Sequence, residues 1–204
     1  MRVGILGGTF DPIHCDHLIM AEEASKALSL SEVVFVPAGK PWMKEGRGIT
    51  PAKVRLQMVR LAIAASPLFR VSTIEINRPG ATYTVDTLEE LRKEWGPATE
   101  VHFIIGMDAL IEMPRWKEQK RIMDLCNLVI FTRTEHTKEV SEAVLAQLPG
   151  LRERMRVIDG STQGISSTDI RRRVSKGMSI RNHAPRLVEQ FIVERGLYKD
   201  SELA

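Results

Sequence analysis

Short apolar runs alternate with amphipathic stretches along most of the chain. The apolar runs predict strands at residues 3–6, 33–36, 69–76, 101–105, 128–132 and 155–158. Apolar residues at spacings of three and four predict helices at 17–28, 51–65, 84–95, 137–148, 168–175 and 186–195. Continuous apolar strands are typical of a parallel sheet buried on both faces. The pattern therefore predicts an α/β fold, a doubly wound parallel sheet with helices on both faces.

The helix at 51–65 carries the clearest predicted start. Pro51 suits the first helical position, and Thr50 before it is expected to be the N-cap. The longest connection with few helix or strand signals is 39–50, which follows a predicted strand. Since open α/β sheets bind ligands beyond the carboxyl ends of their strands, we expect 39–50 to be a mobile loop near the ligand.

Length and composition indicate one globular domain. The chain has 204 residues, of which 43% are hydrophobic and 27% charged, which is ordinary globular usage. We expect a single domain over 1–204 with a helical C-terminal part from about 165. The net charge of +3 suits anionic small molecules and is too weak to indicate a nucleic-acid partner.

Cysteine usage and the N-terminal sequence favour a cytoplasmic protein. Cys15 and Cys126 lie far apart without metal-binding spacing, so neither a disulfide framework nor a zinc site is expected. The N-terminus lacks the features of a signal peptide, and no apolar run approaches the ~20 residues of a membrane helix. We expect no membrane partner, and leave open whether the chain forms a homo-oligomer.

The first candidate motif, residues 7–17 (GGTFDPIHCDH), follows the first predicted strand. It is neither a Walker A loop nor a GxGxxG fingerprint, but it occupies the same place before a helix. Gly7 and Gly8 let the backbone approach a phosphate, and the helix N-terminus supplies amides and a positive dipole end. His14 and His17 can each donate a hydrogen bond to a phosphate oxygen. The motif therefore predicts a phosphate-binding turn.

The second candidate motif, residues 165–171 (ISSTDIR), leads into a predicted helix. One of the hydroxyls of Ser166, Ser167 and Thr168 can cap this helix while its first amides face a phosphate. Arg171 lies about one turn further on and can reach the same anion. The alternative is a plain N-cap followed by a solvated basic face.

Both motifs resemble the signatures of the nucleotidylyltransferase superfamily, GxFDPxHxxH and ISSTxIR. Within it, TYTVDTL (82–88) and FIIGMDAL (103–110), followed by Trp116, are similar to the nicotinate mononucleotide adenylyltransferase family. The resemblance covers nearly the whole chain. It implies a Rossmann-like fold and transfer of an adenylyl group from ATP to nicotinate mononucleotide, giving deamido-NAD and pyrophosphate, with Mg²⁺ accompanying ATP.

The resemblance also implies the site residues. Such chemistry needs positioning and charge neutralisation rather than a covalent nucleophile, so His14, His17 and Arg171 are expected to act catalytically as donors at the triphosphate. The residues expected to bind ATP are Gly7, Gly8, Thr9, Phe10, Lys40, Gly106, Asp108, Ser166, Ser167 and Thr168. The residues expected at the mononucleotide are Tyr83, Thr84, Trp116 and Arg133.

Individual roles within these sets differ. Asp108 is expected near the nucleotide ribose, Trp116 on the pyridine ring, and Tyr83 with Thr84 at the nicotinate carboxylate. Arg133 is expected at the mononucleotide phosphate. Each of these assignments has a purely structural alternative. Asp108 could be an acid that stabilises a helix N-terminus, Trp116 a core residue, and Arg133 an exposed surface arginine. No protein residue is expected to bind a metal directly.

The chain departs from the family pattern at two places. Asp16 stands where the family usually has glycine: it either points away and caps the following helix, or points inward and repels the triphosphate. Pro41, Trp42, Met43 and Lys44 replace the usual Pro-Pro-His-Lys, which weakens Lys44 as a phosphate ligand. The alternatives left open are nicotinamide mononucleotide or phosphopantetheine as acceptor, and a regulatory nucleotide-binding module in which Asp16 impairs turnover.

Overall fold

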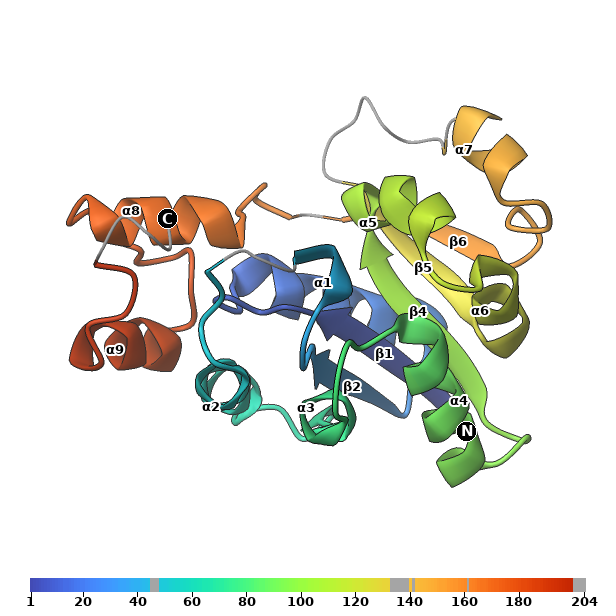
Figure 1. Ribbon diagram of the computed structural model, residues 1–204, viewed down its shortest axis with the longest axis horizontal. Coiled ribbons are helices and arrows are strands. Elements are labelled where there is room, and N and C mark those ends of the chain that lie inside the picture. The colour runs from blue at the N-terminus through green and yellow to red at the C-terminus, as the bar shows by residue number, and fades with distance from the viewer. Residues whose placement is uncertain (45–47, 133–139, 141, 161, 200–204) are drawn as a thin grey trace.

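The computed structural model describes residues 1–44, 48–132, 140, 142–160 and 162–199 (Figure 1). Its described strands form one six-stranded sheet, all parallel, in the order β3-β2-β1-β4-β5-β6. These strands are β1 (Arg2–Gly8), β2 (Glu32–Pro37), β3 (Phe69–Val71), β4 (Glu100–Gly106), β5 (Asn127–Thr132) and β6 (Met155–Asp159). The predicted α/β doubly wound sheet is therefore confirmed.

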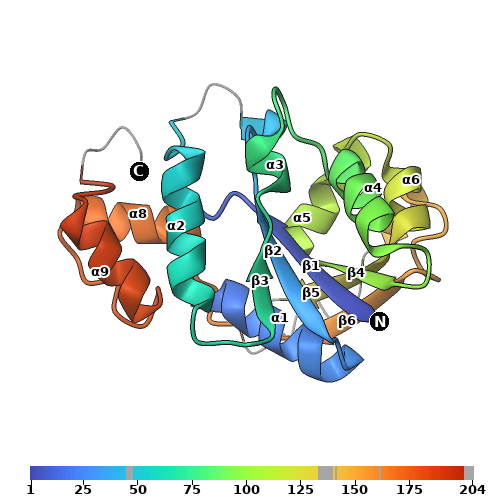
Figure 2. The same ribbon diagram turned by 90° about the horizontal axis from the view of Figure 1, so that it is seen from below.

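Helices cover both faces of this sheet (Figure 2). One face carries α1 (Cys15–Leu28) and α2 (Ala52–Ile63). The helices α8 (Ser167–Ser175) and α9 (Arg186–Glu194) join the same apolar core from beyond α2, away from the strands (Figure 1). The other carries α4 (Thr84–Trp95), α5 (Met107–Glu112), α6 (Gln119–Leu125) and α7 (Glu142–Gln147). The remaining short helices are η1 (Trp42–Lys44), α3 (Ile74–Asn77) and η2 (Met113–Arg115).

The two faces have separate apolar cores because strand side chains alternate. In β1, Val3 and Ile5 are buried against the α4 side, whereas Leu6 is buried on the α1 side. In β4, Phe103 is buried on the α4 side and Ile104 on the α1 side. This double burial explains why the strands read as continuous apolar runs rather than as alternating ones.

The strand predicted at 69–76 is wrong over its second half. β3 ends at Val71, and α3 begins at Ile74, whose amide donates to the Ser72 hydroxyl. A side chain at Gly39 would place its Cβ 2.1 Å from the carbonyl oxygen of Glu75. The chain after β3 is thus turned into close contact with the connection that follows β2, and only glycine fits at that contact.

The predicted N-cap at Thr50 is also wrong. Pro51 is the N-cap residue of α2, without a side-chain cap. The Thr50 amide instead donates to Asp11 Oδ2 at 3.2 Å, and its carbonyl accepts from Arg55 Nε at 2.8 Å. Tertiary contacts with the first motif therefore override the local capping signal.

Most other elements lie within a few residues of their predicted bounds, and α4 matches its bounds at both ends. The sequence pattern missed α5 and α6, which are short. Of the helix predicted at 137–148, residues 137–139 and 141 lie outside the described residues. No helix in the described part of the chain is long and apolar enough to cross a membrane. The single domain over 1–204 stays a prediction.

Candidate active site

The strand order reverses at β1, which lies between β2 and β4. In open parallel sheets the crevice beyond the carboxyl ends of the strands at such a reversal binds ligands. The first motif begins with Gly7 and Gly8, the last two residues of β1, and Gly106 ends β4 beside it. The sheet topology thus places the candidate site at this edge.

Phe10 gives the first motif its shape. It adopts a left-handed φ of 51° although it is not glycine, a conformation that costs roughly 1–2 kcal/mol. Packing holds it there: its ring is buried and lies 4.9 Å from the His17 ring and 6.0 Å from the Phe35 ring, between centroids. A Cβ at Gly8 would lie 3.1 Å from the Phe10 ring, so glycine there gives the ring room.

The two histidines of the first motif lie together. Their ring centroids are 3.7 Å apart, with His14 at the N-cap of α1 and His17 in its first turn. The His14 amide donates to His17 Nδ1 at 3.2 Å. Because Nδ1 accepts a hydrogen bond, the proton of the neutral His17 ring sits on Nε2. His17 therefore has the tautomer that donates from the tip of the ring.

Asp11 joins this motif to two distant parts of the chain. Its carboxylate is buried and accepts from the Tyr198 hydroxyl at 2.6 Å and from the Thr50 amide at 3.2 Å. The peptide bond between Asp11 and Pro12 is cis. Tyr198 lies beyond the last helix, where no periodic pattern or motif points to it, so the sequence analysis missed it.

The second motif meets the first at the start of α8. Ser166 is the N-cap, and its Oγ accepts from the Asp169 amide at 3.0 Å. The Ser167 hydroxyl donates to the Pro12 carbonyl at 2.8 Å, across 155 positions of sequence. Arg171 Nη1 donates to the Asp11 carbonyl at 2.8 Å. The two motifs are therefore hydrogen-bonded to each other.

Asp16 binds backbone amides of a distant segment and does not cap the helix in whose first turn it lies. It does not cap α1, whose N-cap is His14. Its carboxylate instead accepts two backbone amides, from Gln163 to Oδ1 at 3.0 Å and from Ile165 to Oδ2 at 2.9 Å. The side chain is buried at 3% exposure. The expected cap is wrong because the segment before the second motif supplies partners that local sequence cannot reveal.

Arg55 connects the first motif to the connection after β2. Its buried guanidinium donates to the carbonyl oxygens of Thr9 (2.6 Å), Ala38 (2.7 Å), Gly39 (3.2 Å) and Thr50 (2.8 Å). Burial lowers the pKa of Arg55, while Asp11, Tyr198 and Glu75 act in the opposite direction. An arginine on the apolar face of an amphipathic helix gave a weak signal, and the sequence analysis did not single it out.

The residues expected at the mononucleotide lie at the start of α4 and the end of η2. Tyr83 is the N-cap residue of α4, and Thr84 begins the helix. Trp116 follows η2, with its ring centroid 6.2 Å from that of Phe103. Its indole Nε1 is buried and has no hydrogen-bond partner among the described residues. This edge of the sheet thus offers aromatic rings, an indole donor and a helix N-terminus.

Two residues beside this group were not singled out from the sequence. The Trp42 ring lies 5.9 Å from the Tyr83 ring, between centroids, and Lys117 Nζ lies 5.0 Å above it. Lys117 Nζ also lies 2.9 Å from Asp86 Oδ1, and this hydrogen bond raises the pKa of Lys117. In the sequence Trp42 was noted only as part of the segment that replaces the usual Pro-Pro-His-Lys. Its contact with Tyr83 could be seen only in the folded structure.

The other expected ligands are placed less specifically. Lys40 and Asp108 are exposed, Lys40 after β2 and Asp108 in the first turn of α5. Arg133 lies outside the described residues, as do 45–47 of the expected loop and the side chain of Lys44. In the part of the chain that the structure describes, no group of three or more histidine, cysteine or acidic residues could hold a metal ion.

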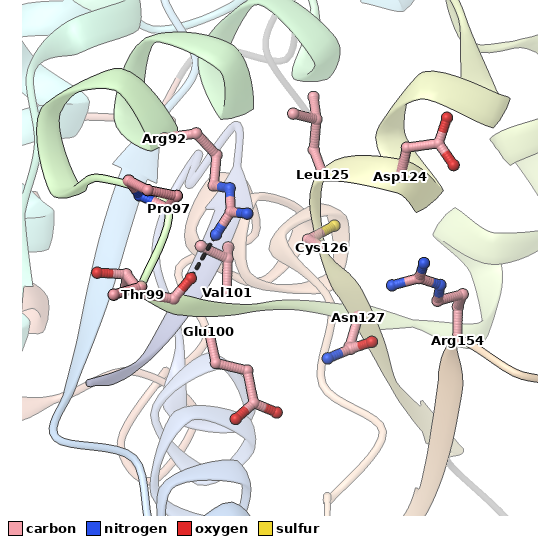
Figure 3. Close-up of a pocket in the computed structure, with 11 residues that line it drawn as sticks. Arg92, Pro97, Thr99, Glu100, Val101, Asp124, Leu125, Cys126, Asn127 and Arg154 are labelled. Atoms are coloured by element: carbon pink, nitrogen blue, oxygen red, sulfur yellow. Dashed lines mark hydrogen bonds between the residues drawn. The ribbon is translucent and has the colours of Figure 1, made fainter.

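A cavity of about 270 Å³ lies at the opposite end of the sheet (Figure 3). Its lining includes Glu100 and Asn127, which begin β4 and β5, and Arg92, which donates to the Thr99 carbonyl. Neither motif contributes to it. We therefore locate the candidate active site at the carboxyl edge of the sheet and not in this cavity.

Comparisons with known proteins identify relatives over nearly the whole chain. A family model described as cytidylyltransferase-like matches residues 5–173, a range that includes both motifs. The chain is 43% identical over 198 residues to a probable nicotinate-nucleotide adenylyltransferase of Dehalococcoides mccartyi, covering 97% of each chain. It is 44% identical to one from Moorella thermoacetica, covering 97% of this chain and 92% of the relative.

The fold is also similar to a solved structure. A nicotinic acid mononucleotide adenylyltransferase of Plasmodium falciparum, solved in complex with NaAD, superposes with a TM-score of 0.79 over 97% of both chains at 21% identity. At that identity the similarity concerns the fold alone.

The contact between Tyr198 and Asp11 predicts a pH-dependent stability. Burial and the Asp11 carboxylate raise the pKa of Tyr198 well above its ordinary value of 10.0. Below pH 10 the phenol is protonated in both the folded and the unfolded chain, so its contribution to the free energy of unfolding does not change with pH. Above pH 10 the unfolded chain loses this proton and the folded chain keeps it, so stability falls by about 1.4 kcal/mol per pH unit. Urea unfolding from pH 8 to 11 measures this fall.

Tyr198→Phe removes the titrating group and the buried hydrogen bond. We expect a loss of about 1–3 kcal/mol at pH 8 and a shallower decline above pH 10. The control is Tyr83→Phe, which removes the chain's other phenol and should retain the wild-type decline. An equally steep decline in Tyr198→Phe and in the wild type would contradict the assignment.

Proposed function

The chain belongs to the nicotinate-nucleotide adenylyltransferases of the cytidylyltransferase-like group, and from its geometry we propose how its residues carry out their reaction. The enzyme transfers the adenylyl group of ATP to nicotinate mononucleotide, giving nicotinate adenine dinucleotide (deamido-NAD) and pyrophosphate. The proposal concerns which side chains hold the two substrates and what each contributes.

The reaction needs little covalent help from the protein. A phosphate oxygen of the mononucleotide attacks the α-phosphorus of ATP, the bond from this phosphorus to the bridging β-phosphate oxygen breaks, and pyrophosphate leaves. The attacking oxygen is already ionised, so no base is required. Holding the two phosphates in line and neutralising the charge that moves toward the leaving group lower the barrier.

We assign the triphosphate to the space between the two motifs. Nε2 of His17 donates toward it from the first motif, beside His14 and the 7–10 backbone. The first amides of α8, with Ser167, Thr168 and Arg171, face it from the second motif. The observation that carries this assignment is the hydrogen bonding of Ser167 to Pro12 and of Arg171 to Asp11, because it brings both motifs to one edge of the sheet.

We assign the mononucleotide to the neighbouring edge beside α4 and η2. Trp116 offers its ring to the pyridine, and the amides at the start of α4, near Tyr83 and Thr84, suit the nicotinate carboxylate. Lys117 adds a positive charge beside Tyr83. Gly106 ends β4 and Asp108 follows in the first turn of α5; we assign both to the region between the two substrate positions, where Asp108 suits a ribose hydroxyl.

Magnesium fits this site as a companion of ATP. No acidic cluster for a metal occurs in the described ranges, and the carboxylates of Asp11 and Asp16 are engaged by hydrogen bonds. Mg²⁺ commonly binds substrate phosphates while keeping several waters, and when bound it neutralises triphosphate charge.

The free thiols of Cys15 and Cys126 fit the cytoplasmic location expected from the sequence.

The regulatory reading of the chain loses its main support. It rested on a carboxylate at Asp16 repelling the triphosphate. The structure directs that carboxylate to the amides of Gln163 and Ile165, so the charge is compensated within the protein. An active transferase is the function that the geometry favours.

A product assay tests the acceptor. The enzyme is given ATP and Mg²⁺ with nicotinate mononucleotide, nicotinamide mononucleotide or phosphopantetheine in parallel, and products are separated by HPLC. A carboxylate needs donors, whereas an amide needs both a donor and an acceptor, so we expect the highest kcat/KM with nicotinate mononucleotide. Equal kcat/KM for the two mononucleotides would contradict the assignment.

Trp116→Ala should raise KM for the mononucleotide and leave KM for ATP nearly unchanged.

His17→Ala tests the catalytic assignment. Removing a preorganised donor that acts on transition-state charge should lower kcat by ~10²-fold or more while changing ATP affinity much less. Steady-state kinetics and calorimetric ATP binding separate the two effects. His183→Ala is the control, since the contact of His183 with α1 is the hydrogen bond that its backbone carbonyl accepts from the Cys15 amide, which the substitution keeps. Unchanged turnover in His17→Ala would remove this residue from the mechanism.

A further inference from the structure

Asp16 links the two motifs, at a position where the nucleotidylyltransferase signature usually has glycine. It lies in the first turn of α1, between His14 and His17 in sequence. Its two carboxylate oxygens accept the amides of Gln163 and Ile165. Ile165 is itself buried and directly precedes Ser166, the N-cap of α8. One side chain of the first motif therefore holds the backbone that enters the second.

We propose that Asp16 is a positioning residue for ATP, which fixes the start of α8 relative to the histidine pair. The inference rests on the proposed function, because it takes the triphosphate to lie between the two motifs. A carboxylate that accepts two backbone amides in a buried place forms charge-assisted hydrogen bonds, which are among the strongest in proteins. Such a link sets both the distance and the direction of the segment it holds.

The negative charge is tolerated for physical reasons visible in the structure. Asp16 sits at the amino end of α1, where the helix dipole favours an anion. The two amides complete its hydrogen bonding within the protein. The carboxylate thus turns toward the backbone of 163–165 and leaves the histidine side of the turn to the substrate.

Other contacts between the motifs do not replace this link. Ser167 and Arg171 reach the carbonyls of Pro12 and Asp11 from within α8, whereas Asp16 holds the chain just before the helix. Without it the approach to α8 would be held only by the packing of Ile165 and by the Ser166 cap among the contacts described for this segment. A displacement of about 1 Å in groups that position a substrate can cost ~10²-fold in rate, so a modest loosening here is measurable.

The test compares two variants with a matched control. Asp16→Ala removes both acceptors and keeps a good helix former, and Asp16→Asn keeps the size and one acceptor. Glu22→Ala removes an exposed acid from the same helix. We expect kcat/KM for ATP to fall about tenfold in Asp16→Ala and about threefold in Asp16→Asn, with KM for nicotinate mononucleotide within about twofold. Glu22→Ala should match the wild type.

Hydrogen exchange on the full chain supplies a readout independent of turnover. In Asp16→Ala the amides of Gln163 and Ile165 should exchange about tenfold faster, while those of β1 stay unchanged. ATP kinetics within twofold of the wild type, or equal losses toward both substrates, would overturn the positioning role. A wild-type enzyme that makes no dinucleotide would instead overturn the proposed function, and the exchange comparison would still decide whether Asp16 holds this segment.

Discussion

The buried peptide segment of Asp11 and Pro12 holds the site together. Its carboxylate accepts the Thr50 amide and the Tyr198 hydroxyl, and its two carbonyls accept Arg171 and the Ser167 hydroxyl. The start of α2, the chain after α9 and the start of α8 are therefore fixed to one turn after β1. Each of these groups is costly to leave unpaired inside a protein, so the contacts stabilise each other.

Arg55 extends this arrangement to the connection after β2. Its guanidinium donates hydrogen bonds to the carbonyl oxygens of Thr9, Ala38, Gly39 and Thr50. These residues are buried or half-buried at the carboxyl edge of the sheet. Arginine suits this role because five donors on a rigid plane can serve several acceptors. The site is thus held by buried hydrogen bonds from side chains far apart in sequence rather than by the loops alone.

The sequence predicted the fold well because burial on both faces of the sheet leaves a strong apolar pattern, as in β1 and β4. It also located the two motifs, at the end of β1 and at the start of α8, because glycine pairs, histidines and a capping serine are the local chemistry expected of a phosphate-binding turn. It failed where tertiary partners decide. The amide of Thr50 binds Asp11, Asp16 binds backbone near Ile165, and Tyr198 lies in no motif. Such partners are set by the folded chain and leave no period in the sequence.

The central claim is that both motifs form one triphosphate site. A crystal structure of the enzyme with Mg²⁺ and an ATP analogue whose α,β-bridge resists cleavage tests it most directly. We expect the triphosphate between the rings of His14 and His17 and the first turn of α8, with Asp11 still bonded to Tyr198. A triphosphate that contacts only one motif, or that lies at the amino edge of the sheet beside Arg92, would contradict the account.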